Sequence, residues 1–321
     1  MNATVGSPRL RADRSGPGGP VRSGRASRLA RYAVGYAFVA PIVAFFLTFV
    51  LYPFLRSFYI SLTQWSGFGV PRFVGLMNFA NLLDDEIFWQ SLRTTLVFTV
   101  VSTVLQTVLP MALAILLAAG WRGSVVFRTV FFMPQVVSLV VSGLLWQMMY
   151  DGNFGLVNRM LTSVGLGGLA HNWLADPGTV LPAILVVSLW QSAGFYMLVF
   201  FAGLQGIDQT LYEAARVDGA SKIQEILRIT VPMLAPVTGV VVTLNVLGGV
   251  KVFELIYVMT GGGPNHASEV LGTYLYGLAF GSTAGSTPAV GYATAVSVVV
   301  FVLGMAAVGL QFAMTRRARD V

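Results

Sequence analysis

Few residues in this sequence could take part in catalysis, and their spacing argues against an active site. The carboxylates of Asp84, Asp85 and Glu86 are consecutive, so their side chains do not share one face of a helix or strand. His171 and His266 are far apart in the sequence, and neither has a neighbouring set of metal ligands. The pattern favours a solvated helix start for the acidic run and ordinary loop histidines over an acid–base pair or a metal site.

Covalent and phosphate chemistry have no better candidates. The chain has no cysteine, which excludes disulfides, thiolate zinc sites and cysteine nucleophiles. It has no Gly-x4-Gly-Lys-Ser/Thr phosphate-binding loop, and the run Gly261-Gly262-Gly263-Pro264 lacks the flanking strand and helix of such a loop. We therefore interpret this run as a turn and expect no catalytic residue, no metal and no cofactor on this chain.

Polar side chains inside long apolar segments are the more informative candidates. A charge near the centre of a bilayer costs about 2.5–3.5 kcal/mol or more, so such groups usually face a cavity or a partner. Lys251 and Glu254 are one helical turn apart, where they could pair with each other, face a pathway or reach the outer interface. The uncharged candidates are Gln191, Ser192 and Tyr196 after Trp190, and Asn245 before Gly248-Gly249. Asn245 could instead bond to a neighbouring helix.

The composition indicates whether this chain is surrounded by water or by lipid. Only 10% of its 321 residues are charged, against about 25% in an average soluble protein, and 55% are hydrophobic. The mean hydropathy is +0.74. So little charge cannot cover the surface of a folded soluble protein of this length, and it equally excludes a disordered chain. The sequence therefore predicts an all-α integral membrane protein.

Uncharged windows long enough to cross a bilayer give six transmembrane helices. They are expected at about 33–56, 94–118, 128–149, 181–204, 234–257 and 289–313. The segment Gly281 to Thr287 is too polar for hydrocarbon and precedes the last span.

Positive charge gives the orientation. Fifteen of the twenty Lys and Arg residues fall on one side if both termini are cytoplasmic, so the chain is predicted to be N-in and C-in. The basic excess is then a topology signal, and no nucleic-acid partner is expected. The expected organisation is a disordered Arg-rich cytoplasmic arm (1–31), a six-span domain (32–315) and a cytoplasmic tail (316–321).

The cytoplasmic segment 205–233 is a long polar interruption with a helical pattern. Asp208 can cap a first helix, Gly219 marks a bend because glycine costs about 1 kcal/mol inside a helix, and Pro232 starts the fifth span. Opposite charges three or four residues apart are expected to pair: Glu213 with Arg216, Asp218 with Lys222, and Glu225 with Arg228. Apolar residues at helical spacing (Leu211, Ala215, Ile223, Ile226 and Leu227) make the hairpin amphipathic. It either lies in the lipid headgroups or docks on a cytoplasmic partner.

Residues in this segment resemble a known motif. Residues 212–221 read Tyr-Glu-Ala-Ala-Arg-Val-Asp-Gly-Ala-Ser, and residues 229–232 read Ile-Thr-Val-Pro. The arrangement resembles the EAA loop of permease subunits of binding-protein-dependent ABC importers, the MetI-like family, and departs from its fixed positions only at Val231, where Leu is usual. Stretches within 122–134, 253–264 and 274–295 resemble the carbohydrate-uptake branch. The second of these resembles the first member of paired sugar permeases, with Glu254 where Asp is usual.

The resemblance implies a MetI-like importer fold in a bacterial plasma membrane and ATP-driven import of a sugar or sugar-like solute. The implied partners are a second homologous permease, two ATP-binding subunits that hold ATP and Mg, an extracytoplasmic solute-binding protein and membrane lipid. Coupling to the ATPase would involve Glu213, Ala214, Ala215, Asp218 and Gly219. In such relatives the sugar contacts fall on the fourth and fifth spans, and a gapless alignment puts them near Gln191, Ser192, Phe195, Asn245 and Gly249.

Two other classes of protein have less support. A stand-alone secondary transporter or channel would be expected to carry charges deep in several spans and often two similar halves, and neither is evident in the sequence. A membrane enzyme such as a glycosyltransferase would need acidic catalytic residues at a membrane face. Residues 84–86 are the only such cluster, and they are expected outside.

Overall fold

The computed structural model describes residues 26–118, 120, 123–281 and 287–317. The stretches outside the described residues include 1–25 of the predicted arm, most of the polar segment before the last span, and 318–321 of the predicted tail. Residues 26–31, expected in the disordered arm, belong instead to the first helix, and residues 316–317 of the predicted tail belong to the last one. The chain divides into two units, residues 1–56 and residues 57–321.

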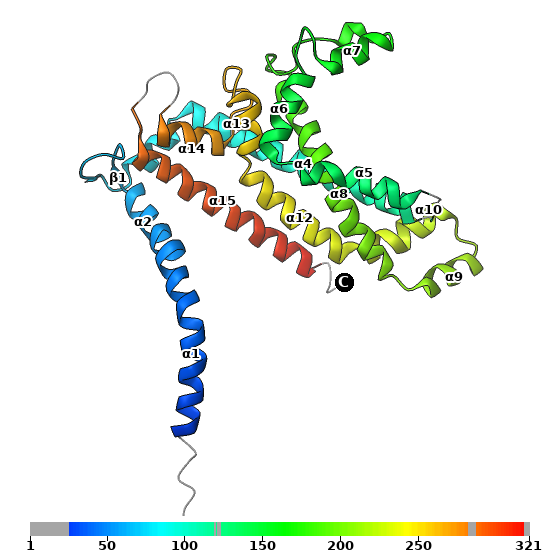
Figure 1. Ribbon diagram of the computed structural model, residues 1–321, viewed down its shortest axis with the longest axis horizontal. Coiled ribbons are helices and arrows are strands. Elements are labelled where there is room, and N and C mark those ends of the chain that lie inside the picture. The colour runs from blue at the N-terminus through cyan, green and yellow to red at the C-terminus, as the bar shows by residue number, and fades with distance from the viewer. Residues whose placement is uncertain (1–25, 119, 121–122, 282–286, 318–321) are drawn as a thin grey trace, which may run out of the picture. The chain divides into compact units, whose positions relative to one another are not determined.

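The first unit is helical throughout its described part. It comprises α1 (Ala26–Phe46), the π-helical turn η1 (Leu47–Leu51) and the start of α2 (Tyr52–Ser61), drawn in blue in Figure 1. The stretch Tyr36–Ser61 has a mean hydropathy of 2.3 in its most apolar window, enough to cross a membrane. Pro41 lies inside α1, which is tolerated in membrane helices.

The second unit is a helical bundle with one small sheet (Figure 1). Strands β1 (Thr63–Gln64) and β2 (Arg72–Phe73) pair antiparallel, with Thr63 opposite Phe73. The helices, in chain order, are α3 (Met77–Leu83), α4 (Glu86–Ala118), α5 (Ser124–Val136), α6 (Leu139–Met149), α7 (Leu156–Ser163), η2 (Gly167–Leu169), α8 (Val180–Gln205), α9 (Gln209–Val217), α10 (Lys222–Glu225), η3 (Ile226–Thr230), α11 (Val231–Met233), α12 (Ala235–Val250), α13 (Glu254–Thr260), α14 (Leu271–Phe280) and α15 (Val290–Arg317).

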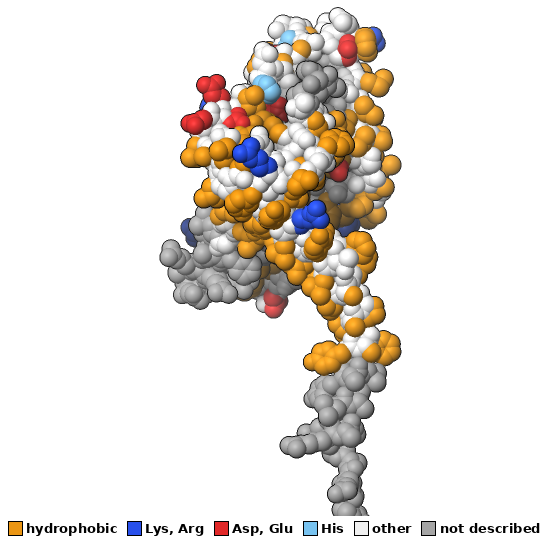
Figure 2. Space-filling view, turned by 90° about the vertical axis from the view of Figure 1, so that its left-hand side faces the viewer, with side chains coloured by type: hydrophobic (Ala, Val, Ile, Leu, Met, Phe, Trp, Pro, Cys, Tyr) orange, Lys and Arg blue, Asp and Glu red, His pale blue; other side chains and the backbone are white. Residues whose placement is uncertain are grey.

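By length and composition, four helices of the described chain can each cross a membrane: Tyr36–Ser61, α4, α8 and Val290–Gly309. Two bent pairs bring the number to as many as six, namely α5 with α6 (bent by 100°) and residues 222–233 with α12 (bent by 64°). Figure 2 shows a face of the molecule on which hydrophobic side chains predominate and charged ones are scattered. A surface of this kind is stable in lipid and not in water.

Two expected spans differ from the helices in the structure. The stretch 128–149 is interrupted where Val137 and Ser138 are extended, and the Ser138 hydroxyl caps α6 by accepting the Val141 N–H at 3.3 Å. The stretch 234–257 is interrupted at Lys251, which ends α12, and α13 is a separate helix. A serine cap satisfies a helix start and therefore permits a break that hydropathy alone cannot detect.

Close helix packing in the core depends on glycine. A Cβ atom at Gly194 of α8 would lie 2.0 Å from the backbone oxygen of Phe131 in α5. A Cβ atom at Gly249 of α12 would lie 2.7 Å from the Thr99 hydroxyl in α4. Both helix pairs therefore approach at distances that no larger residue allows, as is usual between membrane helices.

Asp85, just before α4, forms hydrogen bonds to residues of α4, α14 and α15. One of its carboxylate oxygens, Oδ2, accepts the phenol of Tyr292 in α15 at 2.6 Å and also the phenol of Tyr274 in α14. The other, Oδ1, accepts the Phe88 N–H at 3.0 Å. Burial alone would raise the pKa of Asp85, but the two phenols and the N–H groups of Ile87 and Phe88 lower the pKa below its ordinary value of 3.8. Asp85 is therefore more than a solvated residue at a helix start.

We expect Asp85→Asn to lower the melting temperature by a few degrees at about pH 7, because it removes the charge that the phenols stabilise. A carboxyl with a lowered folded-state pKa stabilises the fold above its unfolded pKa, and this contribution is lost as the pH falls through the folded pKa. The difference from wild type should therefore shrink as the pH falls below 3.8. The control is Asp84→Asn, since Asp84 is exposed. Equal effects of the two variants in thermal unfolding would contradict the assignment.

Candidate functional site

The segment 205–233 forms two short helices joined by a tight turn. Asp208 precedes α9, and its Oδ1 accepts the Thr210 N–H at 2.9 Å, which lowers the pKa of Asp208. Gly219 has a φ of +78°, in the left-handed region that glycine adopts without strain. Ser221 then caps α10 in a capping box with Gln224. The predicted cap and bend are both present in the structure.

The charge pairs of this segment differ from the expected ones. Arg216 Nε donates to Glu225 Oε1 at 3.0 Å, and this interaction raises the pKa of Arg216. Glu225 is only 7% exposed, and Arg216 is its ion-pair partner among the described residues. The three expected local pairs are not formed as ion pairs in the described structure, because the turn at Gly219 brings α10 back alongside α9.

A second contact joins α9 to the chain that follows α10. The Tyr212 hydroxyl lies 3.0 Å from the Thr230 hydroxyl, so the start of α9 is attached to the turn that leads into α12. Glu213, Ala214 and Asp218 are exposed, as is Val217 at 88%, while Ala215 is partly buried. The hairpin is therefore fixed internally while its outer surface stays open.

Under the transport function that the resemblance implies, we expect Arg216→Ala to reduce uptake several-fold without loss of the chain from the membrane, because Glu225 would remain buried without its partner. The measurement is solute uptake by cells at equal membrane levels of the chain. Lys222→Ala is the matched control, since Lys222 forms no ion pair with a described residue. The exchange of both partners, Arg216→Glu with Glu225→Arg, should restore part of the activity. No recovery and an equal loss in the control would contradict a role of this pair.

One polar candidate of α8, Gln191, contacts the break between α5 and α6. Gln191 is 7% exposed, and its Nε2 donates to the Val137 oxygen at 2.9 Å. Its Oε1 is buried without a hydrogen-bond partner among the described residues. Ser192 donates to its own helix at Ser188, and the Phe195 and Tyr196 rings lie 5.3 Å apart. Gln191 is thus the α8 candidate that retains an unused acceptor.

The candidates of α12 have different neighbours. Asn245 is 4% exposed and donates to Val241 of its own helix, so within the described chain it bonds to no neighbouring helix. Gly249 packs against Thr99 of α4. Lys251 and Glu254 are exposed and form no ion pair in the described structure, since the chain bends between α12 and α13. The α8 and α12 candidates therefore contact different elements.

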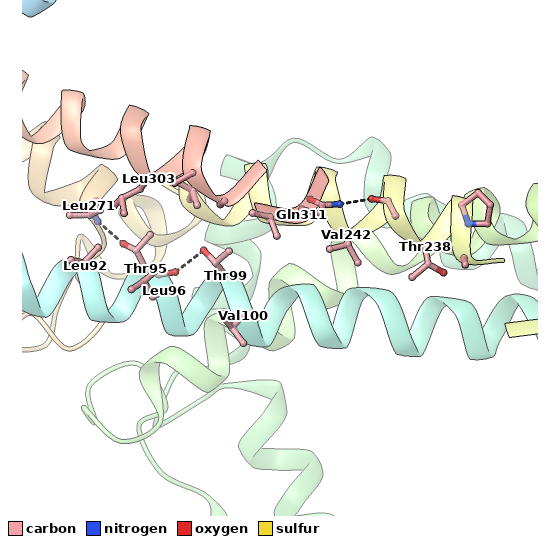
Figure 3. Close-up of a pocket in the computed structure, with 17 residues that line it drawn as sticks. Leu92, Thr95, Leu96, Thr99, Val100, Thr238, Val242, Leu271, Leu303 and Gln311 are labelled. Atoms are coloured by element: carbon pink, nitrogen blue, oxygen red, sulfur yellow. Dashed lines mark hydrogen bonds between the residues drawn. The ribbon is translucent and has the colours of Figure 1, made fainter. Parts of the chain in front are cut away.

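A groove between α4, α12 and α15 has a volume of about 720 Å³ (Figure 3). Thr95, Thr99, Thr238 and Gln311 carry its polar side chains. The three threonine hydroxyls already donate to their own helices, and Gln311 donates to Gly239 O at 2.7 Å. A surface with its polar groups so engaged suits hydrocarbon and does not suit a sugar.

A more polar cavity of about 430 Å³ lies beside the connection between α6 and α8. Its polar lining residues are Gln147, Tyr150, Asp151, Asn172 and Thr260. None of these five is among the site residues predicted from the sequence. The sequence does contain one pattern that could have indicated this cavity. Trp146 and Tyr150 are four residues apart at the end of a span, and Asp151-Gly152 follows them.

Sequence comparison shows which class of protein has this arrangement. The profile described as "Binding-protein-dependent transport system inner membrane component" matches residues 110–320. The probable ABC transporter permease protein YurN of Bacillus subtilis is 37% identical over 278 residues, which cover 85% of this chain and 92% of that protein. The lactose transport system permease protein LacF of Rhizobium radiobacter is 34% identical over 302 residues, which cover 91% of this chain and 98% of that protein.

Solved structures agree with the fold. A crystal structure of a bacterial ABC transporter involved in the import of the acidic polysaccharide alginate contains a similar chain, with a TM-score of 0.78 and 26% identity. The match covers 91% of this chain and 98% of that one. Together these findings define an inner-membrane transport component with a MetI-like fold. This chain belongs to the family of binding-protein-dependent transport system inner membrane components.

Proposed function

We propose that this chain is the permease subunit of an ATP-driven ABC importer that moves a sugar or sugar-like solute into the cytoplasm from an extracytoplasmic binding protein. Sugar transport is named in several relatives, among them the trehalose/maltose permease protein MalF of Thermococcus litoralis, which is 35% identical over 73% of this chain and 79% of that protein. LacF, a permease protein of a lactose transport system, likewise supports a sugar as the solute.

The observation that carries the proposal is the geometry of the hairpin 205–233. A helix that transmits force must be stiff, and the Arg216–Glu225 and Tyr212–Thr230 contacts stiffen this hairpin. A docking surface must also be accessible, and Glu213, Ala214 and Asp218 are exposed. Small residues allow close approach while Glu213 supplies a charge for orientation. In this proposal the hairpin docks on an ATP-binding subunit, with Glu213, Ala214, Ala215, Asp218 and Gly219 as the coupling residues.

ATP hydrolysis then takes place on separate subunits, which hold ATP and Mg. The remaining partner is a second homologous permease that completes the pathway. In the proposed N-in and C-in orientation the hairpin lies in the cytoplasm, on the side where ATP-binding subunits would dock. The solute pathway is proposed to include Gln191, whose Oε1 has no described partner, because a sugar hydroxyl could donate to that oxygen.

Co-purification tests the proposal. The full chain, isolated from its own host in mild detergent, should bring with it a second six-span permease and a nucleotide-binding subunit. Deletion of the gene should abolish uptake of at least one sugar that the host uses, and the gene in trans should restore it. A chain that is isolated alone and still transports in proteoliposomes would refute the proposal.

A further inference from the structure

We propose that the polar cavity beside the α6–α8 connection is a binding subsite for uncharged saccharides on the extracytoplasmic side. The inference rests on the proposed function and extends it by naming a site and a class of sugar. In the proposed orientation the connection between α6 and α8 faces the side from which the binding protein delivers solute.

The walls of this cavity are held in place by a buried side chain. Asn158, in α7, donates from Nδ2 to the backbone oxygens of His171 at 2.9 Å and Gly152 at 3.3 Å. Its Oδ1 accepts the indole N–H of Trp173 at 2.8 Å. The two backbone stretches that carry Asp151 and Asn172 are therefore fixed relative to each other, which is the preorganisation that a binding site requires.

The third wall is attached to α6. Gln147 Nε2 donates to the backbone oxygens of Val258 and Met259, both at 2.9 Å, so α6 and the end of α13 are joined at the cavity. Thr260, which follows Met259, has its hydroxyl within 2.7 Å of the Ser268 hydroxyl. These hydrogen bonds fix parts of the lining of a cavity that is open to the outside.

Several polar groups of the lining remain available to a ligand. Asp151 Oδ1 accepts the N–H groups of Asn153 and Phe154 at 2.8 and 3.1 Å, while its Oδ2 has no hydrogen bond within the described chain. Gln147 Oε1 and the side-chain amide of Asn172 are likewise unused among the described residues. These groups provide acceptors and a donor for hydroxyl groups, which both donate and accept.

Aromatic rings lie at the same place. Tyr150 lines the cavity, and its ring centroid is 5.2 Å from that of Trp146 and 6.1 Å from that of Trp173. Trp146 in turn lies 5.5 Å from Trp190, the neighbour of Gln191. Tyr150 is 5% exposed and its hydroxyl donates to the Ala183 oxygen at 3.2 Å, so it is a fixed part of the wall, and hydrogen bonds to a sugar would come from the other polar side chains. The rings extend from the cavity towards the α8 residue proposed for the pathway.

Charge selects the class of sugar. Among the described residues that line the cavity, Asp151 is the only charged one, and none is Lys or Arg. A sugar carboxylate would meet the unbalanced charge of Asp151 and would have no cation to neutralise it. The cavity therefore favours uncharged saccharides over uronates, in contrast to the acidic cargo named for the structural relative.

The test measures binding to the full chain in lipid nanodiscs by saturation-transfer NMR. The probes are maltose, lactose and diacetylchitobiose as uncharged disaccharides and a diuronate from alginate as the acidic one. At least one uncharged probe should bind in the millimolar range, and the diuronate should not. Asn172→Ala should weaken that binding about fivefold through one lost hydrogen bond. Asn153→Ala is the matched control, because Asn153 lies on the same turn outside the lining.

Asp151→Asn gives a sharper test, because asparagine keeps the acceptor for the two N–H groups and removes only the charge. This variant should bind the diuronate within about threefold of the uncharged probe. Absence of binding by all three uncharged probes at tens of millimolar, or diuronate binding to wild type equal to theirs, would overturn the inference. So would an Asn172→Ala variant that weakens attachment of the binding protein and leaves saccharide binding unchanged.

Uptake by cells separates this inference from the proposed function. If the wild-type chain restores uptake but Asn172→Ala and Asp151→Asn leave both binding and the half-saturating sugar concentration unchanged, only the subsite is wrong. If the wild-type chain restores no uptake and carries no second permease with it, the proposed function itself is wrong.

Discussion

Uptake of solute is expected to fall at least tenfold when Gly219 is replaced by valine, with the chain still inserted in the membrane. Gly219 has a φ of +78°, and a β-branched residue in that region costs about 1–2 kcal/mol or more. The hairpin would relieve this strain by opening the turn, which would separate Arg216 from Glu225 and displace the exposed residues Glu213 and Ala214, for which we propose a coupling role. Since about 1.4 kcal/mol corresponds to a factor of ten in rate, a strain of this size is enough for a tenfold loss.

A series at the same position separates backbone strain from side-chain volume. No atom lies within 4 Å of a Cβ placed on Gly219, so added volume meets nothing within the described chain. Asparagine tolerates the left-handed region better than alanine, and alanine better than valine, so uptake should fall in the order Gly, Asn, Ala, Val. Gly206→Ala is the control, because Gly206 has an ordinary φ of −84°. Wild-type uptake by the valine variant, measured at equal membrane levels, would exclude this role of the turn.

The second large effect is expected at Gly194, where alanine should strongly reduce the yield of folded chain and its melting temperature in detergent. A Cβ atom there would lie 2.0 Å from a backbone oxygen of α5, and backbone cannot move aside as a flexible side chain can. Overpacking of this kind typically costs about 1–3 kcal/mol, and forced separation of α5 from α8 would add to that cost. Glycine to alanine usually stabilises a helix, so the expected sign is the reverse of the ordinary one.

Gly248→Ala is the matched control, because Gly248 also lies inside a helix but has no atom within 4 Å of the position that a Cβ would take. This variant should be neutral or slightly more stable than wild type. Size-exclusion chromatography and thermal unfolding of both variants in the same detergent measure the difference. Equal behaviour of the two would show that α5 and α8 do not pack closely at Gly194.

The sequence predicts those features of this fold that depend on local chemistry. Uncharged windows predict membrane helices because burial of charge in lipid is costly, and α8 (Val180–Gln205) agrees with the window 181–204. The Asp208 cap and the bend at Gly219 follow from properties of single residues. Such features are predictable because they involve only a few neighbouring residues.

Features that depend on residues distant in the sequence are harder to predict. Oppositely charged residues three or four positions apart on a helix usually pair, which predicts an ion pair between Arg216 and Glu213. The turn instead brings Glu225 to 3.0 Å from Arg216. Asp85 meets phenols 189 and 207 positions later, which no local pattern reveals. The α5–α6 break likewise depends on two extended residues within an apolar stretch. The polar cavity combines residues from separate stretches of the chain, so only folding brings them together.

The link between the hairpin and α12 determines how movement could spread. Residues 222–250 run as helix through a 64° bend at Leu234 with no intervening loop. Hydrogen bonds continue across the bend, from Leu234 N–H to Thr230 O at 3.0 Å and from Thr238 N–H to Leu234 O at 2.8 Å. Leu234 itself is fully buried beside Phe200 and Met197. A displacement of residues 222–233 would therefore be expected to tilt α12 about the packed side chain of Leu234, since no flexible loop separates the two helices.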